Sequence, residues 1–185
     1  MATTKAAATP AKTAITVKGR FSYVHVFEPT AMEGSDKKKY SVSLIIPKSD
    51  TATIAIIKAA IEQAKADGLT SKFGGKIPVS GFKVPLRDGD AERPDSPEYK
   101  NSYFLNASSN NKPGIVDIAK EPILDTTEFY SGCHGRANVN FYPFNTNGSK
   151  GIACGLNHVQ KLDEGEALGG RVSIDEAFDD ADLSA

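Results

Sequence analysis

The sequence has no tryptophan and few residues of the kinds that carry redox, metal or acid–base chemistry. Its 185 residues include two cysteines, two methionines and three histidines. Cys133 and Cys154 are too few for a disulfide framework, and reduced thiols are typical of the cytosol. Three histidines provide few candidates for general acid–base catalysis.

Long apolar runs are also absent. The longest, such as Val42 to Pro47, are too short to span a bilayer, and the first twelve residues lack the apolar segment of a secretory signal. We therefore expect no membrane association and a cytoplasmic location. With 39% hydrophobic and 24% charged residues, the composition is that of a globular protein. A chain of this length suits one domain with tails, which buries roughly 70% of its unfolded surface.

Motifs of common enzyme classes are missing. The sequence contains neither a GxxxxGK[ST] phosphate-binding loop nor a GxSxG nucleophile elbow. Asp88, Asp90 and Asp95 have the side chains of a Mg²⁺-dependent nuclease, but they lie among glycines and prolines, which favours a solvated turn. We therefore expect a protein that is not an enzyme.

A zinc site is a further alternative, since the residue types are present in Cys133, His134, Cys154 and His158. Cys154 and His158 would be separated by roughly 13 Å on a strand, at about 3.3 Å per residue. The spacing favours a buried Cys154 over a metal ligand, and we expect no metal or other cofactor.

Charge is segregated along the chain. Residues 163–185 hold eight acidic residues and one arginine, a net charge of −7, whereas residues 1–162 hold 21 basic and 15 acidic residues, a net charge of +6. A basic body with an acidic tail suggests that the body binds a polyanion and that the tail competes with it or recruits partners. An ordinary solvated surface with a charged terminus is the alternative.

The hydrophobic pattern predicts about five main strands and one helix. We expect strands at residues 15–27, 38–46, 99–107, 129–144 and 150–162, with a bulge or bend after Tyr23 and a hairpin turn at Asn147-Gly148. A helix capped by Ser49 or Asp50 should run to about residue 66. Residues 68–98 form a long Gly/Pro-rich insertion, with a short extended piece at 82–84.

This order predicts a mainly β fold, a five-stranded antiparallel barrel of the OB-fold type with one α-helix. A β-sandwich with a helix is the alternative. The expected organisation is a disordered arm at 1–14, the barrel domain at 15–162 and a flexible acidic tail at 163–185.

One face of the strand 136–144 carries basic, amide and aromatic side chains together. The odd positions Ala137, Val139 and Phe141 suit the core, which leaves the other face to Arg136, Asn138, Asn140, Tyr142 and Phe144. Single-stranded nucleic acid needs this combination: arginine for phosphates, amides for base edges and rings for stacking. Packing of either ring under a loop is the alternative.

The neighbouring strand presents small residues beside that face. Ile152, Cys154 and Leu156 suit the core, and Gly151, Ala153, Gly155 and Asn157 line the other side. Such a row leaves a shallow floor that backbone or a flat base can approach, or it marks a bend at a barrel corner.

Several blocks of the chain resemble a known family. These blocks are GRFSYVHVFEP, KKYSVSLIIPK, PLRDGD, YKNSYFLNA, PGIVD, EFYSGCHGRANVNFYPF, KGIACGLNHVQKL and DEAFDDAD, in this order over about residues 15–182. They are similar to the phage-encoded OB-fold single-stranded DNA-binding proteins, whose podophage members have acidic tails. The resemblance implies sequence-independent binding of single-stranded DNA in phage replication, recombination or repair, in the cytoplasm of the infected bacterium. It also implies that the tail competes with DNA and contacts replication or recombination proteins.

Together these patterns predict a set of DNA-binding residues, some for phosphates, some for stacking and some for hydrogen bonds. They are Lys18, Arg20, Tyr23, Lys38, Lys39, Tyr40, Tyr103, Arg136, Asn138, Asn140, Tyr142 and Phe144. Two other functions stay open: a structural or adaptor protein without DNA binding, and a single-strand annealing recombinase. Both a monomer and a dimer fit the sequence.

Overall fold

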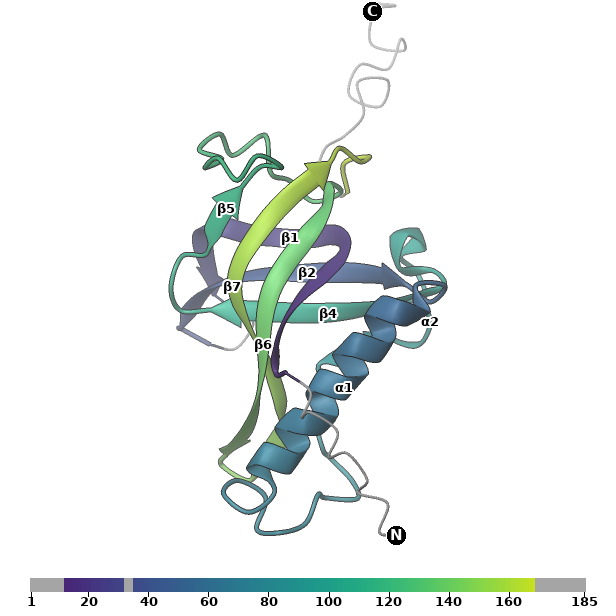
Figure 1. Cartoon of the computed structure of the whole chain (residues 1–185), viewed down its shortest axis with the longest axis vertical. Helices are drawn as coiled ribbons and strands as arrows, with labels where there is room; N and C mark the ends of the chain where they lie inside the picture. The colour runs from purple at the N-terminus through teal and green to yellow at the C-terminus, as the bar shows by residue number, and fades with distance from the viewer. Residues whose placement is uncertain (1–11, 32–34, 169–185) are drawn as a thin grey trace, which may run out of the picture.

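The computed structural model describes residues 12–31 and 35–168, which form seven strands, two α-helices and one 3₁₀ helix (Figure 1). The strands are β1 (Ala14–Ala31), β2 (Lys38–Pro47), β3 (Leu86–Asp88), β4 (Ser102–Ser109), β5 (Gly114–Val116), β6 (His134–Thr146) and β7 (Ser149–Asp163). The helices are α1 (Thr51–Gly68), α2 (Gly89–Glu92) and the 3₁₀ helix η1 (Pro97–Tyr99).

Five of these strands close into a barrel. β1 pairs antiparallel with β2 and β6, β2 pairs with β4, and β6 pairs with β7. A single parallel pairing, Ser108 of β4 with Gly155 of β7, completes the circle. The order β1–β2–β4–β7–β6 confirms the predicted OB-fold barrel in place of a sandwich, and short β3 and β5 extend it at the edges.

The barrel core is built from the inward faces predicted for β6 and β7. Side chains at alternate positions point to opposite faces of a strand. The six expected core residues are each at most 5% exposed: Ala137, Val139, Phe141, Ile152, Cys154 and Leu156. Desolvation raises the pKa of the Cys154 thiol, which leaves it a small apolar core residue.

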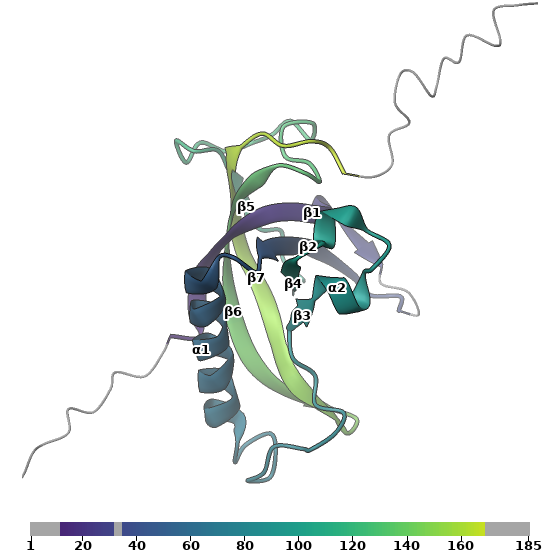
Figure 2. The same ribbon diagram turned by 90° about the vertical axis from the view of Figure 1, so that its right-hand side faces the viewer.

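Helix α1 covers one side of the barrel beside β6. Asp50 caps it, because its side chain accepts a hydrogen bond from the Thr53 backbone N–H at 3.2 Å. One face of α1 is buried against the barrel, with Ile54, Ile57, Ala60, Ile61 and Ala64. Figure 2 shows α1 and the β3–α2 segment on opposite sides of the β6–β7 hairpin.

Two predicted irregularities are confirmed. The β1–β2 register shifts between Ser22 and His25, and Tyr23 has a φ of 46°, which turns β1 sharply. Asn147 and Gly148 have φ values of 51° and 83°, and they join β6 to β7 with Thr146 opposite Ser149. Positive φ at both positions is what a tight hairpin turn requires.

Two predicted strand starts are wrong, and burial is the reason in both cases. β4 begins at Ser102, since Tyr99 is fully buried in η1, where its hydroxyl donates to Ser43 at 3.3 Å. β6 begins at His134, since the loop residue Phe129 packs on the Phe21 ring at 4.8 Å. A buried aromatic residue gives the same hydrophobic signal in the sequence whether it lies in a strand or in a loop that covers the core. The extended piece predicted at 82–84 is confirmed by the bridge of Lys83 to Gly151 of β7, and β3 follows it as a further short strand.

The predicted end segments lie mostly outside the described residues. This is true of residues 1–11 of the arm and 169–185 of the acidic tail. Within the described part, the Thr13 carbonyl already accepts a hydrogen bond from Phe141 N–H at 2.9 Å, and the chain after β7 packs on the barrel as far as Leu168. No helix in this part has the length and hydropathy to cross a membrane.

The packing of α1 generates a stability prediction. Replacing Ile57, which is fully buried, with alanine should lower the free energy of unfolding by about 2–5 kcal/mol, because the lost contacts leave a cavity. Ile56→Ala is the matched control: Ile56 is 53% exposed, so this change should move stability by less than about 0.5 kcal/mol. Urea denaturation followed by circular dichroism compares the two. Equal effects would contradict the packing of α1 on the barrel.

Candidate nucleic-acid interface

A groove opens where β4 and β7 separate. The two strands pair at Ser108 and Gly155, and away from this point the segment of residues 83–93 lies between them. We call it the bridging segment. A hollow of about 690 Å³ lies among β4, β7 and this segment, and a second of about 220 Å³ continues it over β2 and β4. The two hollows share Lys39, Asn106 and Ser108, so they form one groove.

The bridging segment is hydrogen-bonded to β7 at one end. Lys83 N–H donates to the Lys150 carbonyl at 3.0 Å, and the Lys83 carbonyl accepts from Ile152 N–H at 2.9 Å. A Cβ atom at Gly151 would lie 2.5 Å from the Lys83 carbonyl oxygen, so a glycine is required for this close approach. Part of the small-residue floor predicted on β7 is therefore covered by the protein's own backbone.

The floor of the groove is polar and made of short side chains. Ser41 and Ser43 of β2 lie on the face opposite the core residues Val42 and Leu44, and they pair with Ser108 and Asn106 of β4; Ser43 is only 2% exposed and accepts a hydrogen bond from the Tyr99 hydroxyl. Hydroxyls and an amide side by side offer both donors and acceptors. Such a floor accepts the varied edges of nucleic-acid bases without a fixed pattern.

Aromatic rings stand at both ends of the groove. Tyr23 lies at the β1 end and is 50% exposed because of the sharp turn of the strand. Tyr142 and Phe144 of β6 line the other end. Exposed rings of this kind are surfaces on which bases stack.

Positive charge comes from β2 and from the bridging segment. The cations that line the groove are Lys39, Lys83, Arg87 and Arg93, against one acid, Glu92. The Arg93 guanidinium carbon lies 4.8 Å from the Tyr23 ring centroid and 5.1 Å from those of Tyr99 and Phe104. Its Nη1 donates to the Tyr23 hydroxyl at 3.1 Å.

Arg93 has no acidic counterpart in the described part of the chain. No carboxylate there lies within 4.0 Å of it, and its buried Nε has no hydrogen-bond partner. A guanidinium held among rings keeps its positive charge, and a cation at this end of the groove attracts a phosphate. This makes Arg93 a candidate phosphate ligand.

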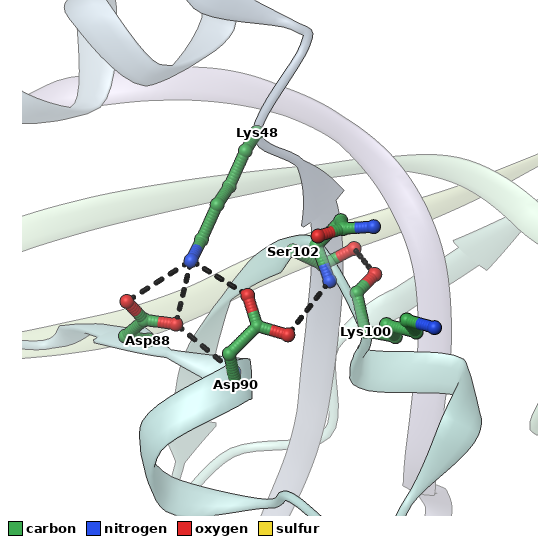
Figure 3. Close-up of polar contacts among 6 residues, drawn as sticks. Lys48, Asp88, Asp90, Lys100 and Ser102 are labelled. Atoms are coloured by element: carbon green, nitrogen blue, oxygen red, sulfur yellow. Dashed lines mark hydrogen bonds and ion pairs between the residues drawn. The ribbon is translucent and has the colours of Figure 1, made fainter.

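A compact ionic network holds the other end of the bridging segment (Figure 3). Lys48 Nζ, just after β2, lies 2.9 Å from the Asp88 carboxylate and 2.7 Å from that of Asp90. Asp88 also accepts from Asp90 N–H, and Asp90 from Asn101 N–H, each at 2.9 Å. These bonds join β3 and α2 to the ends of β2 and β4, which places Arg87 and Arg93 over the groove.

The network perturbs the ionisation of all three side chains. Hydrogen bonds from Lys48 hold the pKa values of Asp88 and Asp90 below their usual range. Hydrogen bonds to Asp90 and then Asp88 raise the pKa of Lys48. The two aspartates considered above for Mg²⁺ thus pair with a lysine, and the described residues contain no cluster that would hold a metal ion.

The residues predicted from sequence divide between the groove and other surfaces. Tyr23, Lys39, Tyr142 and Phe144 line the groove. Lys18, Arg136, Asn138 and Asn140 lie on the outer face of β1 and β6, where Lys18 pairs with Arg136 across the strands.

The outer-face residues are partly bonded to one another. Asn138 accepts from Asn157 at 2.9 Å and donates to Thr16 at 3.2 Å, and Arg136 Nε donates to Gln160 at 2.6 Å. A Cβ at Gly155 would lie 2.6 Å from the Asn140 side-chain oxygen. Since Gly155 pairs with Ser108, this face continues from the groove across β7.

Arg20 lies near the end of the described chain, away from the groove floor. Its Nε donates to the Gly132 carbonyl at 3.1 Å and its Nη2 to the Glu166 carbonyl at 2.6 Å. Leu168 N–H donates to the Ser131 carbonyl at 2.8 Å, and the Leu168 side chain packs against the small cluster of Ile45, Tyr99 and Phe104. The described chain therefore ends beside Tyr23, and Leu168 and Tyr23 line the same hollow.

The remaining three predicted residues lie outside the groove. Tyr103 is half-buried, with the ammonium groups of Lys48 and Lys58 at 5.2 and 5.7 Å from its ring centroid. Tyr40 and Lys38 occupy the alternate face of β2, opposite the face that carries Lys39.

Sequence reasoning missed the polar floor and the arginines of the bridging segment. The alternation of β2 places Ser41 and Ser43 on the same face as Lys39, which is a usable signal in the sequence. Arg87 and Arg93 lie in a stretch with no periodicity, so their position depends on the Lys48 network. No local pattern reveals that contact, because it joins residues about 40 positions apart.

The geometry agrees with comparisons to known proteins. Residues 12–185 match the family described as Enterobacter phage Enc34, ssDNA-binding protein. Protein p50 of Acyrthosiphon pisum secondary endosymbiont phage 1 is 35% identical over 171 residues, which cover 89% of this chain and 91% of that protein.

Solved structures show the same arrangement. The single-stranded DNA-binding protein from bacteriophage Enc34 in complex with ssDNA has a TM-score of 0.73 and 26% identity, over 85% of this chain and 90% of that one. The single-stranded DNA-binding protein gp2.5 of bacteriophage T7 has a TM-score of 0.59 and 16% identity, over 87% and 92% of the two chains, and shares the fold.

The ionic network generates a prediction about the bridging segment. Lys48→Met should speed hydrogen exchange of the amides in residues 86–93 and leave the barrel amides protected, because the anchor is lost while the core is intact. Lys58→Met is the control, since Lys58 also lies over Tyr103 but is not bonded to Asp88 or Asp90.

Acid should likewise lower the protection of these amides in the wild type, when exchange at each pH is compared with the intrinsic exchange rate at that pH. The folded-state pKa values of both aspartates are depressed, so the anchor is complete above their unfolded value of about 3.9 and is lost as the pH falls through the folded values. Exchange in 86–93 that is unchanged by Lys48→Met would contradict the anchor.

Proposed function

Because the chain belongs to the family of the Enterobacter phage Enc34 single-stranded DNA-binding protein, we propose that it binds single-stranded DNA without sequence preference during phage DNA replication, recombination or repair. The DNA lies in the groove between β2, β4, β7 and the bridging segment. The protein acts in the cytoplasm of the infected bacterium as a binding protein, not as an enzyme.

The observation that carries this proposal is Arg93, a cation held among aromatic rings at one end of the groove and paired with no carboxylate of residues 12–31 and 35–168. Lys39 and Lys83 add charge along the same path, and Tyr142 and Phe144 offer rings at the far end. Phosphate contacts supply affinity that is independent of sequence, and stacking accepts every base.

The outer face of β1 and β6 provides a second stretch for the DNA. A strand that leaves the groove over Gly155 meets Asn140 and Asn138 and then the cross-strand pair of Lys18 and Arg136. Two facing cations repel each other, and a phosphate between them relieves that repulsion. The groove contacts the DNA first, and the outer face extends the bound length.

The acidic segment acts as a competitor of the DNA. Five acidic residues and one arginine follow Leu168, and the contacts of Arg20, Ser131 and Leu168 start this segment beside the Tyr23 end of the groove. A tethered polyanion has a high effective concentration at a basic surface. DNA binding then releases the segment for replication or recombination proteins.

Fluorescence anisotropy with labelled oligo-dT and a matched duplex, at two salt concentrations, tests the proposed function. We expect binding to oligo-dT that weakens steeply with salt and exceeds binding to the duplex. Arg93→Met should reduce the slope of log K against log salt by about 0.7, the value for one phosphate of a single strand. The same change at Arg136 reports whether the outer face takes part.

Two outcomes would contradict this assignment. Absence of binding to either DNA, with and without residues 169–185, would leave the adaptor function. An Arg93→Met protein with an unchanged slope would remove Arg93 from the DNA path, even if the protein binds.

Removal of residues 169–185 should raise the affinity for oligo-dT several-fold, with the largest gain at low salt, because salt screens the competition. The matched control keeps the length and replaces Asp175, Glu176, Asp179, Asp180 and Asp182 by their amides. If charge is the cause, this variant binds like the deletion. Identical binding of the wild type and both variants at low salt would exclude competition by this segment.

A further inference from the structure

Arg87, the other arginine of the bridging segment, differs from Arg93 because its guanidinium group pairs with a carboxylate. Arg87 Nε donates to Glu92 Oε2 at 2.8 Å, and Nη2 donates to Oε1 at 2.6 Å. Both side chains line the large hollow of the groove, in the same wall as Lys83 and opposite Tyr142 and Phe144.

The two parallel hydrogen bonds use the fork of Arg87 in the way that a phosphate would. Carboxylates and phosphates each offer two oxygens at the spacing of a guanidinium fork, so they compete for the same donors. Glu92 therefore fills the position that a DNA phosphate would take on Arg87. Arg93, six residues further along the chain, is bonded to a tyrosine hydroxyl and to no carboxylate of the described residues.

The pair is open enough to exchange. The side chains of Arg87 and Glu92 are 44% and 38% exposed, so water screens the pair and a phosphate can approach it from solvent. The Arg87 guanidinium carbon lies 5.3 Å from the Phe104 ring centroid, a contact that does not depend on Glu92. Arg87 thus keeps its place over the groove when its partner changes.

The backbone, in contrast, keeps Glu92 near Arg87. Glu92 is the last residue of α2, which begins at the capping residue Asp88, and Asp88 is bonded to Lys48. The carboxylate of Glu92 therefore stays close enough to Arg87 to pair with it again.

We propose that Glu92 is an intramolecular competitor of the DNA: it occupies the fork of Arg87 in the free protein, and a phosphate displaces it on binding. This inference rests on the proposed function and identifies Glu92 as a residue that sets the affinity of the groove. An arginine from which Glu92 must first be displaced adds less affinity for DNA than an unpaired arginine does. When Glu92 pairs with Arg87 again, the DNA strand is released faster.

Glu92→Gln tests the proposal, because it removes the charge and keeps the shape. We expect a several-fold higher affinity for oligo-dT at low salt and a nearly unchanged salt slope, since a phosphate contacts Arg87 in both complexes and only the displacement of Glu92 is no longer needed. Glu62→Gln is the matched control: Glu62 pairs with Lys65 on α1, on the other side of the β6–β7 hairpin, and its loss changes the net charge equally.

Arg87→Met in both backgrounds separates competition from a general charge effect. In the Glu92→Gln background, Arg87→Met should abolish the gain in affinity for oligo-dT. In the wild-type background, Arg87→Met should lower the affinity by a smaller factor than in the Glu92→Gln background. Three results would each overturn the proposal: equal effects of Glu92→Gln and Glu62→Gln, a gain that survives Arg87→Met, or weaker binding by Glu92→Gln. The last would mean that Glu92 positions Arg87 for DNA.

The wild-type titration distinguishes this failure from failure of the proposed function. A wild type that binds oligo-dT while Glu92→Gln has no added affinity refutes the role of Glu92 alone. A wild type that does not bind refutes both. Urea denaturation of each variant confirms that the fold is retained.

Discussion

The single pairing of β4 with β7 is the constraint on which the groove depends. Ser108 opposite Gly155 closes the barrel around one core, and the two strands diverge on either side of that point. A longer pairing would seal the wall. Because the closure is so short, the bridging segment lies between the two strands beside it, and the groove is bounded by that segment, β4 and β7.

A second dependence follows from this opening. The bridging segment has little regular structure of its own, so its position comes from its two attachments, the backbone bonds of Lys83 to β7 and the Lys48 network at β3 and α2. The ion pairs are exposed and individually weak. Their effect is geometric: they hold two arginines over a polar floor that β2 and β4 provide.

The arginines of the groove differ in how far they are paired with carboxylates. Arg93 is free of carboxylates among the described residues, Arg87 is occupied by Glu92, and the acidic segment after Leu168 begins beside the same groove. The two proposals made above give these anions one role: Glu92 and the acidic segment both compete with the DNA, which allows tight binding together with release. Such a balance suits a protein that coats single strands which other proteins must later use.

The sequence by itself determined the barrel, the helix and the inward faces of β6 and β7, because these depend on periodicity within single elements. Alternation at Ala137, Val139 and Phe141, the cap at Asp50 and the turn at Asn147-Gly148 are local signals, and each was confirmed. It also pointed to Tyr23, Lys39, Tyr142 and Phe144, which the fold collects in one groove. Tertiary structure alone decided that Arg20 bonds the chain before Leu168, that Tyr103 lies under two lysines, and that Arg87 and Arg93 reach the groove. Those positions are set by contacts between distant residues such as Lys48 and Asp88, and no local pattern in the sequence encodes such a contact.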